Sequence, residues 1–309
     1  MLRTLDIPIA HIDDAASVDG VLDALRTLHG PDYEFAVGRW AGQTRLLSQP
    51  GQVIYRFIIQ AEGATIALQP GELVRGHPAE AAYRPLDPPF AEVAGPHIEA
   101  LWPGDALTLG PERPEGVLLD GQATYFDVIT EQTGYRRPRL AMLRHLPDFP
   151  RGCAAYPGAF RRETLPPDRE SRSSGNPRGS NRINEHTLDM RVDRAPGPGP
   201  HHHGTIADAS GQVFNHSETA IILPRSAYGL PEVDRPDQGR IRIYRRPAED
   251  PSDQVLIPVR PGSIVVTPAT PEQVMGHCFE NAFAMLVAIP GFVVPHRAIT
   301  KGEIQHENR

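Results

Sequence analysis

The sequence predicts an all-β protein made of two similar β barrels, preceded by one short helix. Its 309 residues include 33 prolines and 28 glycines, which exceeds average usage and favours many turns and short strands over long helices. Short apolar runs separated by glycine and proline recur from residue 33 onward. Two of these segments recur 158 residues later, which indicates an internal duplication.

The helix is expected near the beginning of the chain, over Ser17–Leu28. Its apolar residues have the spacing of one helical face and are Val21, Leu22, Leu25 and Leu28. Either Ser17 or Asp19 is the expected N-cap, because both side chains can accept a hydrogen bond from the first turn.

The strands fall into two groups that define the expected domains. The first group includes YEFAVGRW, QVIYRFIIQ and QATYFDVIT, and the second includes ETAIILP, GRIRIYRRP and GSIVVTP. Residues 161–182 contain arginine, serine, glycine and proline with almost nothing apolar, which predicts a linker or mobile loop. We therefore expect a first barrel with its leading helix over 1–135, a connector over 136–182 and a second barrel over 183–309.

The duplication is based on a repeated Pro-Gly turn followed by an apolar strand. WPGDALTLGPE at 102–112 matches RPGSIVVTPAT at 260–270, and the same shift pairs ATYFDVITEQTG at 123–134 with NAFAMLVAIPGF at 281–292. The alternative is that any such turn before a strand produces this likeness.

The second half contains two motifs that resemble those of the cupin family. GSIVVTP supplies the glycine and proline of the second cupin motif, Gly262 and Pro268, and HCFEN supplies its histidine and asparagine, His277 and Asn281. The loop between Pro268 and His277 is four residues longer than in the family pattern. The first motif, HxH followed by glutamate, is similar to PGPGPHHHG followed by a longer segment and Glu218. The resemblance implies two double-stranded β-helix (jelly-roll) barrels, a bicupin, with a metal site in the second barrel.

The ligand set that this resemblance implies is His201, His203, Glu218 and His277. Alternate residues of a strand share a face, so His201 and His203 would project together, as would His216 and Glu218. A register slip of one residue would make His202 the ligand instead. His216 is an alternative to Glu218, and the triplet could also be a solvated loop. Cys278 would point away from the site as a small core residue.

Imidazole and carboxylate together suit several divalent ions, and Fe(II) is favoured over Zn(II), Mn(II), Ni(II) and Cu(II). The resemblance therefore implies a metal-dependent enzyme acting on a small polar metabolite, first of all an oxygenase. An isomerase, a lyase, an enzyme forming N–N bonds in natural-product biosynthesis, or a non-catalytic ligand-binding protein are the alternatives.

Other polar residues are weaker candidates for lining the pocket of the second barrel, and the matching positions of the first barrel can be compared with them. Four of them, expected near the pocket on residue type and alternation, are Arg225, Tyr228, Arg242 and Tyr244, with His186 and Asp189 of lower rank. An ungapped shift of 158 residues places Leu119 opposite His277, Gln60 opposite Glu218, and 43–45 opposite the triplet, so the first barrel is expected to have lost the ligands. His77 and His97 are expected to be ordinary surface or loop histidines.

Charge and missing motifs exclude several other classes. The net charge of −7 gives no reason for binding nucleic acid or an anionic membrane. The two cysteines, Cys153 and Cys278, form no CxxC pair, and GxGxxG, GxxxxGK[ST], GxSxG and HExxH are absent. Neither a signal peptide nor an 18-residue apolar stretch is found, so a cytoplasmic protein with a small-molecule substrate is expected, with a homodimer left open.

Overall fold

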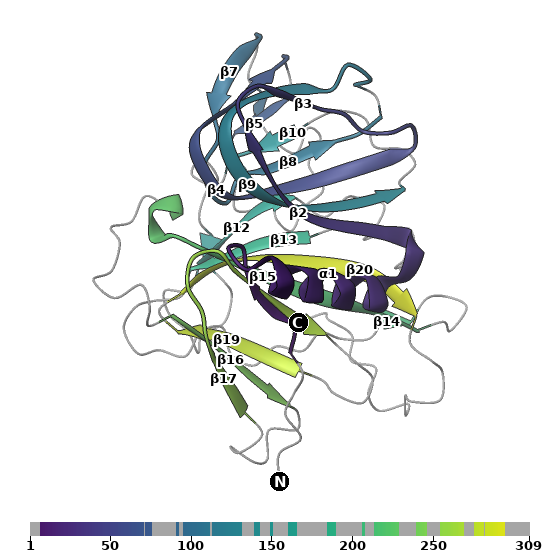
Figure 1. The fold of residues 1–309 in the computed structure, drawn as a ribbon, viewed down its shortest axis with the longest axis vertical. Coiled ribbons are helices and arrows are strands. Elements are labelled where there is room, and N and C mark those ends of the chain that lie inside the picture. Colours follow the sequence, from purple (N-terminus) through teal and green to yellow (C-terminus); the bar gives the residue numbers. More distant parts are fainter. Residues whose placement is uncertain are drawn as a thin grey trace.

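The computed structural model describes the following ranges: 7–70, 72–75, 91–92, 95–111, 113–131, 139–142, 149–150, 160–165, 184–189, 206–207, 213–228, 239–245, 254–268, 275–280 and 282–293. Within them the chain forms three β-sheets and one α-helix, so the all-β fold class is confirmed (Figure 1). No helix in these ranges is long and apolar enough to span a membrane.

The helix α1 spans Ala15–His29 and begins earlier than expected. Its N-cap is Asp14, whose carboxylate accepts a hydrogen bond from the Ser17 backbone N–H, so the prediction of a cap at Ser17 or Asp19 was wrong. The helix ends at Gly30, where φ is 66°. The buried side of α1 carries Val18, Val21, Leu22, Leu25 and His29.

The first sheet is built almost entirely from the first half of the chain and contains nine strands. Their bounds are β2 (Tyr33–Ala41), β3 (Thr44–Leu46), β4 (Gln52–Leu68), β5 (Leu73–Arg75), β6 (Ala91–Glu92), β7 (His97–Ala100), β8 (Ala106–Leu109), β9 (Val117–Glu131) and β10 (Arg139–Ala141). The order is β2-β9-β4-β8-β10-β5-β6, with β3 on β9 and β7 on β4. A 3-10 turn, η1 (Gly30–Asp32), connects α1 to this sheet.

The second half of the chain forms a larger and a smaller sheet. The larger one has the order β1-β18-β15-β20-β13-β12-β11, with β14 on β15, and the smaller one has the order β17-β16-β19. The larger sheet contains β1 (Ile9–His11), β11 (Phe149–Pro150), β12 (Phe160–Leu165), β13 (Asn184–Asp189), β14 (Ile206–Ala207), β15 (Val213–Leu223), β18 (Ser263–Pro268) and β20 (Phe283–Val293). The smaller contains β16 (Arg240–Arg245), β17 (Gln254–Pro258) and β19 (Met275–Glu280), and η4 (Arg225–Tyr228) follows β15.

The path of the chain between these two sheets is that of a jelly roll. From β15 it crosses to β16 and β17 in the smaller sheet, returns to β18, crosses again to β19 and ends in β20. The larger sheet therefore has the order β18-β15-β20-β13, with non-consecutive strands as neighbours. This double-sheet arrangement is the fold used by cupins.

Strand pairing crosses the boundaries expected at residues 135 and 182. The strand β10, after residue 135, pairs with β8 in the first sheet, and β11 and β12 join the larger sheet of the second half. The first strand of the chain, β1, pairs with β18. Of the segment expected to be a loop, 161–165 belong to β12 and 166–182 lie outside the described residues.

Three apolar clusters account for the described core. One is contained in the first sheet and includes Ile54, Ile58 and Leu107. A second lies between the two sheets of the second half and joins Ala220 and Ile222 to Ile243. The third, which we call the inter-barrel cluster, contains residues of both halves and of α1, and Figure 1 shows this helix beside β15 and β20. The interior of the second barrel is thus separate from the interface between the halves.

Candidate functional site

Glu218 is the one predicted ligand whose side chain the structure describes. It lies in β15 and is only 5% exposed. Along this strand, Ala220 and Ile222 belong to the cluster between the two sheets, and alternation places Glu218 on the same face. Its neighbour across the sheet is Thr267 of β18, which is fully buried. A carboxylate therefore faces the interior of the second barrel.

His277 occupies a register position on the opposite sheet. It lies in β19, directly across from Ile243 of β16, and Cys278 lies across from Arg242. Residues directly opposite one another in an antiparallel pair share a face. The Ile243 side chain is fully buried in the cluster that also contains Ala220 and Ile222. The backbone register thus places His277 on the face of the smaller sheet that is turned toward the larger sheet.

The structure does not describe the side chains of the other predicted ligands. His201, His202 and His203 lie outside the described residues. The backbone of His216 is in β15 opposite Pro290, next to a register shift between β15 and β20. Within the described part of the chain, no three His, Cys, Asp or Glu residues form a group that could hold a metal ion.

Among the weaker candidates, only the side chain of Arg225 is described. The Arg225 guanidinium lies 5.0 Å from the centre of the Phe283 ring, which belongs to the inter-barrel cluster. On β16, Ile241 and Ile243 are buried and Arg240 is exposed. The structure describes only the backbone of Tyr228, Arg242 and Tyr244, and of His186 and Asp189 in β13.

A buried histidine that no sequence pattern singled out lies on the other side of β15 from Glu218. His29, at the end of α1, is 3% exposed, and its Nε2 lies 2.7 Å from Oγ of Ser217. Burial lowers the pKa of His29 to about 3, so its ring is neutral at physiological pH. Because 188 residues separate the partners, no local pattern predicts this contact.

The equivalent interior position of the first barrel carries isoleucine. The Gly104 N–H donates to the Ile58 carbonyl in the same way as the Gly262 N–H donates to the Ile222 carbonyl, both at 2.8 Å. Ile54 lies four residues before the acceptor Ile58, and Glu218 lies four residues before the acceptor Ile222. The expectation that Gln60 matches Glu218 was wrong, because an ungapped shift ignores that more residues separate Ile58 from Gly104 than separate Ile222 from Gly262.

A buried ion pair fills the first barrel next to Ile54. Arg56 donates two hydrogen bonds to the Asp127 carboxylate, at 2.8 and 2.7 Å, and its guanidinium lies 3.5 Å from the centre of the Tyr125 ring. Burial raises the pKa of the Asp127 carboxyl, while Arg56 acts in the opposite direction. The pair satisfies its own hydrogen-bonding groups and is a structural element of this barrel.

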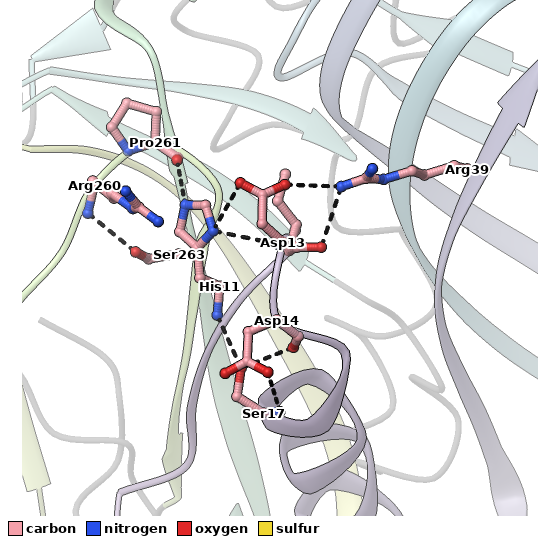
Figure 2. A network of polar contacts seen from close by, with 9 residues as sticks. His11, Asp13, Asp14, Ser17, Arg39, Arg260, Pro261 and Ser263 are labelled. Carbon is pink, nitrogen blue, oxygen red and sulfur yellow. Dashed lines mark hydrogen bonds and ion pairs between the residues drawn. The ribbon is translucent and has the colours of Figure 1, made fainter.

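A hollow of about 390 Å³ lies where β1 joins the second half, and Figure 2 shows the network of polar contacts beside it. His11 Nε2 lies 3.1 Å from the Pro261 carbonyl oxygen, and Nδ1 accepts from the Asp13 N–H. Ser17 donates to the Asp14 carbonyl, and Asp13 pairs with Arg39 at 2.9 Å. These residues contact one another. The hollow therefore lies beside the polar contacts that attach β1 to the rest of the protein.

Comparison with known proteins yields remote structural similarity only. No family model matches the chain, and no curated protein sequence matches it. Among solved structures, an IolB-like protein from Salmonella typhimurium LT2 has 13% identity over 84% of this chain and 83% of its own, with a TM-score of 0.47. Protein Ylba from E. coli has 10% identity over 85% and 78%, with a TM-score of 0.46. An oxalate decarboxylase from Lactobacillus farciminis has 12% identity over 84% and 78%, with a TM-score of 0.37.

Proposed function

We propose that this chain is a two-barrel cupin whose second barrel binds one divalent metal ion and uses it on a small polar metabolite. The observation that carries the proposal is the buried Glu218 carboxylate, which faces the barrel interior beside the apolar Ala220 and Ile222. The register of β19 supports it, since His277 stands on the facing sheet.

Two structural similarities support the duplication. The strands β8-β4-β9-β2 and β18-β15-β20-β13 are neighbours in the same order. The two Pro-Gly turns also have the same backbone form, because Gly104 and Gly262 have φ values of 89° and 91°. A repeated local turn alone could arise by chance, but the repeated strand order involves segments far apart in the sequence.

The chemistry of the donor set fits a metal ion. Glu218 and His277 supply the oxygen and nitrogen donors that suit Fe(II), Zn(II), Mn(II), Ni(II) or Cu(II). We assign His201 and His203 as the other ligands, with His202 and His216 as alternatives.

Such a metal supplies Lewis acidity or a site for O₂ when bound. The residues of this chain would then have separate roles. Glu218 would supply negative charge and His277 an imidazole nitrogen, and the apolar Ala220 and Ile222 lie on the same strand face as Glu218. We favour an Fe(II) oxygenase over an isomerase, a lyase or an enzyme forming N–N bonds in natural-product biosynthesis. A non-catalytic ligand-binding protein is the alternative.

Metal analysis of purified variants tests the site. We expect Glu218→Gln, His277→Ala and the double variant His201→Ala with His203→Ala each to lose tightly bound metal. His97→Ala is the matched control, because His97 lies in β7 of the first half and its Nδ1 lies 2.8 Å from the Gly95 carbonyl oxygen. Stoichiometric metal retained in His277→Ala would overturn the assignment.

Oxygen consumption tests the reaction class separately. An oxygenase reconstituted with Fe(II) consumes O₂ only when a substrate is added, and replacement by Zn(II) abolishes turnover. Full activity without O₂ would reject the oxygenase and favour the isomerase or lyase.

A further inference from the structure

Ser217 connects the proposed metal site to the first half of the chain. It precedes Glu218 in β15, and adjacent strand residues point to opposite faces. Glu218 faces the second barrel, whereas Ser217 faces α1, where its Oγ lies 2.7 Å from Nε2 of His29. Ser217 is fully buried, and the rings of Tyr33 and Phe35 lie 5.4 and 5.7 Å from the His29 ring. The contact is therefore shielded from water and held from several sides.

The backbone ladder of β15 has two irregular features next to Ser217. On one side Ser217 lies opposite Pro268, which has no N–H to donate. On the other side the register with β20 shifts between Asn215 and His216, and His216 lies opposite Pro290. From His216 to Leu223 the pairing with β20 is continuous. Ser217 and Glu218 therefore lie in the regular part of the ladder, close to its register shift.

A register slip here would change the metal site. A shift of one residue turns every side chain of a strand to the other face, so it would remove Glu218 from the barrel interior. A buried hydrogen bond to a side chain on the opposite face resists such a slip, because Ser217 and His29 would both lose their partner. The His29–Ser217 contact acts close to the register shift between β15 and β20.

We propose that His29 is a positioning residue for the second barrel: through Ser217 it holds the register of β15 that directs Glu218 into the interior. The proposal rests on the proposed metal site. It makes the helix of the first half a support for the ligand strand of the second half, and His29 itself touches neither metal nor substrate.

Binding of Co²⁺ to the full chain tests this, with the affinity measured by chelator competition and the ligand field by the visible absorption of the bound ion. We expect His29→Leu and Ser217→Ala to weaken Co²⁺ binding about 10-fold, as the loss of a residue supporting a ligand does. The double variant should be no weaker than either single one, and His29→Gln, which keeps a donor near Nε2, should restore most of the affinity. Leu25→Ala is the control, since it removes a fully buried side chain of α1 without touching the bond.

Unchanged Co²⁺ affinity in both His29→Leu and Ser217→Ala would overturn the proposal, as would an equal loss in Leu25→Ala. Amide hydrogen exchange at residues 216–220 separates this inference from the metal site. Faster exchange there in Ser217→Ala and His29→Leu than in Leu25→Ala supports the role of the bond in the register, and equal exchange rejects it. If the unaltered protein binds no Co²⁺, the proposed metal site is rejected. The exchange rates then still test whether the His29–Ser217 bond holds the register of β15.

Discussion

The two halves of the molecule share a strand order and a Pro-Gly turn, yet they differ at one interior position. In the first half this position holds Ile54, opposite Leu109, and in the second it holds Glu218, opposite Thr267. Where the first half has an apolar pair, the second half therefore has a carboxylate and a hydroxyl on a similar framework. Because a fold by itself does not specify a function, this difference is the reason for proposing the metal site in the second half and not in the first.

The first barrel has its own buried charges, but they neutralise each other. Arg56 and Asp127 are joined by two hydrogen bonds, and Trp40 and Tyr125 lie beside the guanidinium. In the second half the residue at the position of Arg56, two residues after Glu218, is Ala220. The two halves therefore carry their buried charges at different positions of the matching strands.

The largest effect is expected from placing a carboxylate in the first barrel. Ile54→Glu should destabilise the protein by about 4 kcal/mol or more, because burial would shift the new carboxyl's pKa by about 3 units and the isoleucine packing is lost. Urea unfolding measures this, with Ile54→Val, at about 1 kcal/mol, as control. The variant should bind no second metal ion. A second ion would show that the first barrel retains a ligand set.

The second largest effect is expected when one partner of the Arg56–Asp127 ion pair is removed. Arg56→Ala should cost about 3 kcal/mol in unfolding free energy, because Asp127 remains buried without its partner. Metal content should stay unchanged. Replacing both residues by Met and Leu should recover most of the loss, and a double variant as unstable as Arg56→Ala would contradict this explanation.

The pH dependence of stability tests His29. Its folded pKa of about 3 lies below the unfolded value near 6.5, so the unfolded chain binds the proton first as the pH falls. This contribution to stability is complete above pH 6.5 and is lost between pH 6.5 and about 3, with a slope approaching about 1.4 kcal/mol per pH unit. His29→Gln should flatten the curve of unfolding free energy against pH in that window. An identical curve would show that another group causes the acid sensitivity.

The smallest effect compares two Pro-Gly turns, one in each half. Alanine at Gly51 or Gly262 must adopt a positive φ, at a cost of about 1 kcal/mol. At Gly262 the added Cβ would also lie 3.0 Å from the Ile12 side chain, whereas at Gly51 it would meet nothing within 4 Å, so Gly262→Ala should lower the melting temperature more than Gly51→Ala. Equal shifts would mean that Ile12 moves away freely and that β1 is loosely attached.

Local patterns predicted most of the described strands and the helix, because alternation and turn residues are visible over a few positions. They also identified Glu218 as an inward-facing candidate. They missed β1, a three-residue strand stabilised by pairing with β18 more than 250 residues later, and they placed the cap of α1 too late. They missed His29 for the same reason, since its environment is created by residues distant in the sequence. Alignment at a constant offset failed at Gln60 because insertions cannot be seen without strand pairing.

The central claim is that only the second barrel carries a metal, and the stoichiometry of the unaltered protein tests it most directly. Elemental analysis of the chain, purified without a metal-binding tag and reconstituted with Fe(II), should find about one ion per chain, falling close to zero in Glu218→Gln. Two ions per chain, or one ion that persists in Glu218→Gln, would contradict the account.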